Sequence, residues 1–312
     1  MNLPHLAAYL LVACYLAFGF TRGQKALLRL QRVGGYTIGV CFLLPYLLAV
    51  NLHPSLDGLI RFAVALALPA WFLHKSGGYR KINGWHALAV LSLWFPLEPS
   101  LFLLPLTLQG RGEILQPVVH WLTLPNVSVP LAPGINLPVE KMTLVLWALY
   151  LFTVRHPLDG LGFTWRLNVQ DFIQALRGLA LFAASGVLLG LAIHFIRWRP
   201  QPSRWSAVLL QWLGMYLFVA LPEEILFRGI IQNLLTRHPR THAWASVLAA
   251  LIFGASHLNN ATPGFPVPNW AYMLIATLAG LAYGLVWQRQ RKVTASALTH
   301  ASVNILWRLL FR

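Results

Sequence analysis

Long apolar runs alternate with short polar and basic stretches along most of this 312-residue chain. A helix that spans a membrane needs about 20 predominantly apolar residues, with a range of about 17–25. By this measure we predict about ten candidate spans, of which three are short and one is interrupted by three prolines and a glutamate. The candidate spans are 5–20, 35–52, 58–74, 84–106, 141–154, 171–196, 205–235, 244–258, 270–288 and 293–310. We therefore expect an all-α polytopic transmembrane helical bundle with about eight to ten spanning helices.

The longest polar stretch, residues 107–140, contains five prolines and is interpreted as an extracytoplasmic loop. It lies between an N-terminal group of candidate spans and a larger C-terminal group. We therefore predict two regions, a membrane region of unassigned role at 1–160 and a core at 161–312 that holds the motifs described below. No internal repeat is visible, although such repeats are common in membrane transporters.

The composition supports an integral, multi-pass membrane protein, because 57% of the residues are hydrophobic and only 10% are charged. A soluble domain is about 25% charged. The formal net charge is +16, but the basic residues cluster in short stretches between apolar runs. That distribution is typical of the positive-inside rule. We interpret these basic residues as signals that orient the protein in membrane lipid. We expect no binding of nucleic acid.

Two of the eight acidic residues, Glu223 and Glu224, are adjacent inside an apolar helix. A carboxylate in hydrocarbon costs about 2.5–3.5 kcal/mol, so an ionisable residue there is a functional hypothesis. Glu224 and Arg228 are four residues apart and share a helix face, whereas Glu223 points about 100° away. Pro222 removes a backbone donor just before the pair and is expected to kink the helix there.

Two later apolar segments carry polar residues at the same spacing. Phe253 and His257 are four residues apart, and so are His300 and Asn304. Each lone histidine, taken singly, is more often a packing residue than a catalyst, and a Glu–Arg pair is often a structural ion pair. Their occurrence together on three hydrophobic helices predicts a polar cluster that must be satisfied within the protein.

Three ordered motifs, Glu-Glu-x-x-x-Arg, Phe-x-x-x-His and His-x-x-x-Asn, resemble those of the CPBP family of intramembrane glutamic endopeptidases. This family includes the type II CAAX prenyl endopeptidases and the bacterial Abi-like proteins. The motifs read Glu223 to Arg228, Phe253 to His257 and His300 to Asn304. The resemblance covers roughly residues 165–312 and leaves the first 160 unexplained.

The resemblance implies a residue-by-residue assignment within an intramembrane protease core at 161–312. Glu223 and His257 would activate a water, and His300 and Asn304 would form the oxyanion hole. Glu224 and Arg228 would be a supporting ion pair. A carboxylate base with donors aimed at a developing oxyanion is also coherent chemistry for peptide hydrolysis by itself.

The expected activity is endopeptidase cleavage of a membrane-associated protein or peptide, without a metal or other cofactor. The expected location is the bacterial cytoplasmic (inner) membrane. The sequence leaves open the substrate, whether it is prenylated, the membrane face to which the site opens and the oligomeric state.

Three alternatives use the same buried acids. A metalloprotease could bind zinc through glutamate and histidine, although the His-Glu-x-x-His spacing is absent. A proton-coupled membrane transporter could use Glu223 in a proton relay. A non-catalytic membrane scaffold could retain the fold without the reaction.

Overall fold

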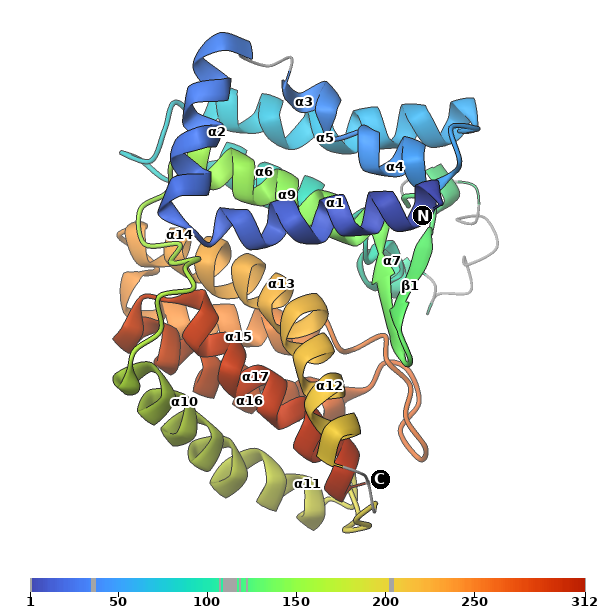
Figure 1. Ribbon diagram of the computed structural model, residues 1–312. Helices are drawn as coiled ribbons and strands as arrows, with labels where there is room; N and C mark the ends of the chain where they lie inside the picture. Colours follow the sequence, from blue (N-terminus) through green and yellow to red (C-terminus); the bar gives the residue numbers. More distant parts are fainter. Residues whose placement is uncertain are drawn as a thin grey trace. The chain divides into compact units, whose positions relative to one another are not determined.

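The computed structural model describes residues 2–34, 38–106, 108, 117, 119–121, 123–201 and 205–311. These residues are largely helical, and their one named sheet is the antiparallel hairpin of β1 (Ser128–Ala132) and β2 (Ile135–Pro138) (Figure 1). The predicted all-α polytopic class is therefore confirmed. The chain divides into two compact units, Met1–Asp159 and Gly160–Arg312.

The first unit consists of the hairpin and helices that differ widely in length, of which α5, with 21 residues, is the longest described. Asn2 caps α1, and Ser55 caps α5, which ends at Gly77 in the left-handed conformation, with φ 74°. The helices are α1 (Leu3–Phe18), α2 (Thr21–Gly34), α3 (Ile38–Cys41), α4 (Leu44–Ala49), α5 (Leu56–Ser76), α6 (Gly84–Trp94), α7 (Pro99–Leu106), α9 (Val139–Tyr150) and the π-helical η3 (Leu151–Arg155).

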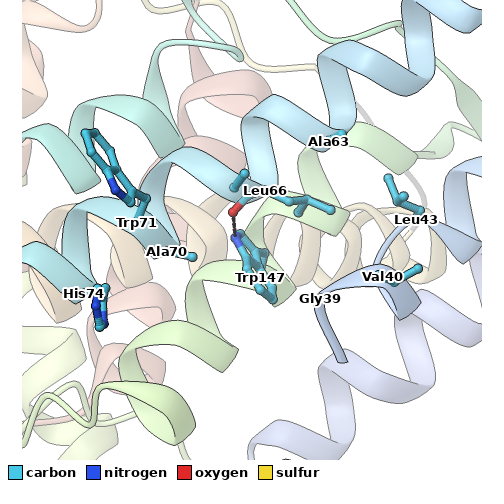
Figure 2. Close-up of a pocket in the computed structure, with 10 residues that line it drawn as sticks. Gly39, Val40, Leu43, Ala63, Leu66, Ala70, Trp71, His74 and Trp147 are labelled. Atoms are coloured by element: carbon cyan, nitrogen blue, oxygen red, sulfur yellow. Dashed lines mark hydrogen bonds between the residues drawn. The ribbon is translucent and has the colours of Figure 1, made fainter. Parts of the chain in front are cut away.

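An apolar cavity of about 460 Å³ lies within this unit. Figure 2 shows Trp147 of α9 pointing toward α5, where its indole N–H donates to the carbonyl of Leu66 at 2.9 Å. Trp71 and His74 lie at one end of the cavity. His74 is the one ionisable side chain among the described lining residues, so this cavity offers no cluster of groups for acid–base chemistry.

The second unit contains the helices that carry the motifs. The 205–237 segment is one continuous helix in which α-helical and π-helical stretches alternate. The elements are α10 (Val169–Phe182), η4 (Ala183–Val187), α11 (Leu188–Ala192), α12 (Trp205–Met215), η5 (Tyr216–Ala220), α13 (Leu221–Glu224), η6 (Ile225–Gln232), α14 (Asn233–Arg237), η7 (His242–Trp244), α15 (Ala245–Ala255), α16 (Trp270–Gln290) and α17 (Val293–Leu310).

The two π-helical stretches, η5 and η6, flank the short α13 turn that holds Pro222 and both glutamates. Proline cannot donate a backbone hydrogen bond, and π-type distortions are common at functional sites. The local irregularity therefore coincides with the acidic pair.

Close packing of α15 against α16 depends on glycine. A Cβ on Gly254 would lie 2.6 Å from the carbonyl oxygen of Met273, and one on Gly280 would lie 3.1 Å from Cα of Ala250. Small residues at such crossings let helix backbones approach closely. This approach brings the second motif, on α15, next to α16.

Fewer helices are long enough to span a membrane than the predicted eight to ten. Four described helices pass by length and composition: Leu56–Ser76, Val169–Ala192, Trp205–Arg237 and Trp270–Gln290. A fifth is possible if α1 and α2, which meet at 104°, form one broken span. The count by helix length is lower than the count from sequence because an apolar run does not show where its helix breaks; Ile38–Ala49 and His242–Ala255, for example, are shorter apolar helices. Part of the predicted 107–140 loop (107, 109–116, 118 and 122) lies outside the described residues.

Candidate active site

The carboxylate of Glu224 receives three polar partners in the core of the second unit. One oxygen, Oε1, lies 2.9 Å from Nδ1 of His300 and 3.3 Å from Nη1 of Arg228. The other oxygen accepts a hydrogen bond from the Ser296 hydroxyl. The side chains of Glu224 and Arg228 are both 0% exposed. The predicted Glu224–Arg228 pair is therefore present, buried, and tied to α17 through His300 and Ser296.

The guanidinium of Arg228 is held from other directions as well. Nη2 donates to the carbonyl oxygen of Gly280 at 2.8 Å. The guanidinium carbon lies 4.7 Å from the ring centroid of Phe253 and 5.4 Å from that of Tyr283. A cation over an aromatic face is attracted by the ring quadrupole. Arg228 thus connects the acidic pair to α15 and α16.

His300 lies between the two glutamates. Its Nδ1 faces Glu224, while its Nε2 lies 3.8 Å from Oε2 of Glu223. The imidazole stacks on the ring of Tyr283, with centroids 4.5 Å apart and an interplanar angle of 16°. The side chain of Glu223 is 26% exposed, in contrast to that of Glu224. Adjacent carboxylates therefore have different surroundings, one enclosed and one open.

A cavity of about 450 Å³ collects the remaining motif residues. Glu223, His257, His300 and Asn304 all line it, from α13, the turn after α15, and α17. Much of the rest of the wall is apolar or aromatic, including Phe182, Val219, Ile275 and Trp307. The structure thus brings the four residues assigned to catalysis to one partly open space.

The histidine of the second motif has a defined orientation. Nδ1 of His257 lies 2.9 Å from the carbonyl oxygen of Phe253, one helical turn earlier. A carbonyl only accepts, so this contact assigns the proton to Nδ1 and leaves Nε2 as an acceptor in the neutral ring. An acceptor nitrogen beside a carboxylate can orient a water molecule.

The amide of Asn304 donates to the sulfur of Met215 at 3.6 Å. Thioether sulfur is a weak acceptor, so a stronger acceptor in the cavity can compete for this donor. Asn304 is therefore suited to bind an oxygen that appears only when substrate is present.

Sequence reasoning missed several residues that complete this site. Ser296 lies four residues before His300 on the same face of α17, a spacing that could have revealed it. Tyr283, by contrast, contacts His300 from another helix, and no local pattern points to it. Among the described residues, no group of three or more His, Cys, Asp or Glu side chains is arranged to hold a metal ion.

Comparison with known proteins adds one match. No curated protein and no solved structure matches the chain. The match is to a family model, covers residues 204–306 and includes all three motifs. It supports a hydrolase, and with the long apolar helices it supports an integral membrane protein. The family resemblance expected from the motifs is thereby confirmed: over residues 204–306, the chain is similar to the family described as Type II CAAX prenyl endopeptidase Rce1-like.

Proposed function

We propose that the protein is an intramembrane endopeptidase that cleaves a membrane-associated protein or peptide. The observation that carries the proposal is the shared cavity lined by Glu223, His257, His300 and Asn304, with the Glu224–Arg228 pair buried behind His300. The similarity of residues 204–306 to a family of endopeptidases supports the same reaction class.

In this proposal Glu223 is the general base, because its carboxylate is the one that opens to the cavity. It takes a proton from a water positioned by Nε2 of His257, and the water oxygen bonds to the carbonyl carbon of the scissile peptide. The proton then passes from Glu223 to the leaving nitrogen as the C–N bond breaks. The products are a carboxyl group and an amine, and Glu223 returns to its ionised form.

The oxyanion of the tetrahedral intermediate would receive hydrogen bonds from Nε2 of His300 and the amide of Asn304. Nδ1 of His300 already donates to Glu224, so donation from Nε2 requires a second proton on the ring. Donors that meet charge only as it develops lower the barrier without tightening ground-state binding.

The walls of the cavity suggest what surrounds the scissile bond. Apolar and aromatic side chains predominate beside the polar group. A segment with apolar side chains on both sides of the cleaved bond would bury them against these walls. A substrate of this kind is consistent with an origin close to or within the membrane.

The decisive experiment compares new protein termini in membranes that contain the wild-type protein, Glu223→Gln or no copy of it. Glutamine keeps the size of the side chain and removes its basicity, so specific termini should fall about 10²-fold or more. Glu98→Gln makes the same chemical change at an exposed position of the first unit and should leave the termini unchanged. Equal termini with wild-type and Glu223→Gln would refute the assignment of the base.

A parallel measurement adds 1,10-phenanthroline and EDTA. Metal-independent cleavage should continue in the presence of both chelators. Loss of cleavage with the chelators, and its recovery when zinc is added, would support the metalloprotease alternative. If no termini depend on the protein but proton uptake into proteoliposomes depends on Glu223, the transporter alternative is supported.

A further inference from the structure

A second cavity in the same unit is lined by two arginines. It has a volume of about 390 Å³ and lies between α10 and α16, two helices that pack against each other (Figure 1). Arg177, Arg289 and Gln174 supply its polar groups. It shares no described lining residue with the cavity of the glutamates. It is therefore a separate site.

One of the two guanidinium groups is held in position by a buried side chain. Nη1 of Arg289 donates to Oε1 of Gln174 at 3.0 Å, and Gln174 is only 7% exposed. This contact uses one of the five N–H donors that a guanidinium carries. Arg289 is itself exposed and lines the cavity, so its other donors are available to a ligand there.

No acidic side chain neutralises this pair of cations among the residues that the structure describes, and none lines the cavity. The acid on α10, Asp171, is already bound by Nζ of Lys292 at 2.7 Å and by the backbone N–H of Asn168 at 2.7 Å. The cavity therefore has an excess of positive charge.

Arg177 is an exposed cation on a predominantly apolar helix. It lies eight residues into Val169–Ala192, a helix long and apolar enough to span a membrane. At about 1.5 Å per residue this is about 12 Å along the helix axis. A basic side chain beside hydrocarbon is costly unless it reaches toward the interface or pairs with an anion. The neighbouring Arg289 makes an anion the more effective partner.

We propose that this cavity binds the phosphate group of an anionic phospholipid. Guanidinium forks match the oxygens of a phosphate through paired charge-assisted hydrogen bonds. Leu181, Leu285 and Val286 line the same cavity, and Leu181 is among the exposed apolar side chains of the unit. Acyl chains can lie along this apolar surface, which inorganic phosphate would leave uncovered.

The surroundings favour the same ligand. Arg289 is followed by Arg291 and Lys292, in a loop whose basic residues predict a cytoplasmic location. Anionic lipids give the cytoplasmic leaflet its negative surface potential, and basic pockets between transmembrane helices bind their head groups. The predicted orientation thus places the site in the leaflet in which this ligand is concentrated.

The test measures binding of phosphatidylglycerol to the full-length protein in neutral detergent by native mass spectrometry. Phosphatidylcholine with the same acyl chains and inorganic phosphate serve as comparison probes. Wild-type protein should bind phosphatidylglycerol at least tenfold more tightly than phosphatidylcholine. Arg177→Gln, which leaves the Arg289–Gln174 bond in place, should weaken phosphatidylglycerol roughly tenfold. Arg177→Gln/Arg289→Gln should abolish the preference.

The matched control is Arg197→Gln/Arg308→Gln, which removes two exposed cations elsewhere in the same unit and should leave binding unchanged. If inorganic phosphate competes as well as phosphatidylglycerol, the phosphate chemistry is supported but the lipid origin is refuted. The proposal fails if Arg177→Gln and the control bind phosphatidylglycerol equally. If Arg177→Gln/Arg289→Gln does not fold, the comparison of Arg177→Gln with wild type still tests the proposal, because Arg177→Gln keeps the bond between Arg289 and Gln174. None of these outcomes depends on endopeptidase activity.

Discussion

Glu223 and Glu224 are neighbours in sequence, yet one lines a cavity and the other is completely enclosed. The difference arises because adjacent helical residues point about 100° apart. Glu224 turns toward Arg228, Ser296 and His300, which satisfy its charge. At the scale of the residue, the contact with the enclosed carboxylate of Glu224 holds His300 next to the carboxylate of Glu223.

Substitution of Arg228 should show how far folding depends on the neutralisation of Glu224. Arg228→Ala leaves the carboxylate of Glu224 without its cation, and breaking a buried pair costs about 3–5 kcal/mol. We expect less folded protein and a lower melting temperature in detergent. Arg308→Ala, at an exposed position of the same unit, is the control and should melt like wild type. An unchanged melting temperature for Arg228→Ala would show that water reaches the pair.

Substitution of Asn304 should lower the rate of cleavage more than it weakens the binding of substrate. Loss of one oxyanion donor typically lowers kcat about 10²–10³-fold, and a donor that acts only on the transition state leaves capture of substrate nearly unchanged. Cleavage and capture are measured separately in Asn304→Ala, with the exposed amide variant Gln288→Ala as control. Parallel loss of capture and cleavage would instead make Asn304 a binding or packing residue.

At the scale of the element, helix crossings bring the motifs together. The second motif contains Gly254, and a Cβ there would lie 2.0 Å from Oγ1 of Thr277 and 2.6 Å from the backbone oxygen of Met273. The glycine between Phe253 and His257 therefore serves the packing of α15 on α16. The motif combines a chemical residue with the contact that positions it.

Gly254→Ala should consequently force the two helices apart. Overpacking of this kind costs about 1–3 kcal/mol, and the backbone oxygen cannot move aside as a flexible side chain could. The expected result is a lower melting temperature together with weaker cleavage, since His257 is displaced. Gly84→Ala is the control, because a Cβ on Gly84 meets nothing within 4 Å. Equal stability of both variants would show that the crossing can relax.

At the scale of the whole molecule, the chemistry belongs to one of the two compact units. Every motif residue, both cavities with charged groups described above and the matched segment 204–306 lie within Gly160–Arg312. The first unit carries the apolar cavity of Figure 2 and has no assigned role. We propose that the protease core corresponds to the second unit.

A chain of residues 160–312 alone is expected to fold and to cleave in a Glu223-dependent manner, because the first unit contributes no group to the proposed reaction. Helical content by circular dichroism and new termini in membranes are the two measurements. The Glu223→Gln form of the same fragment is the control. A fragment that folds but does not cleave would show that residues 1–159 take part in the reaction.

Hydrophobic content and local spacing in the sequence were sufficient to predict the membrane class, the Glu224–Arg228 pair and the three motifs. These depend on hydrophobic content and on the helical repeat, which places residues four apart on one face. The Glu224–Arg228 pair is such a feature, and its ion pair is present at 3.3 Å.

Only the tertiary structure decided how the motifs meet. The contacts of His300 and Ser296 with Glu224 join residues more than 70 positions apart, and the stacking of Tyr283 on His300 joins two helices. The number of long helices likewise depended on where apolar runs bend or break. Hydrophobicity identifies what is buried, but packing of one helix against another determines which buried groups touch.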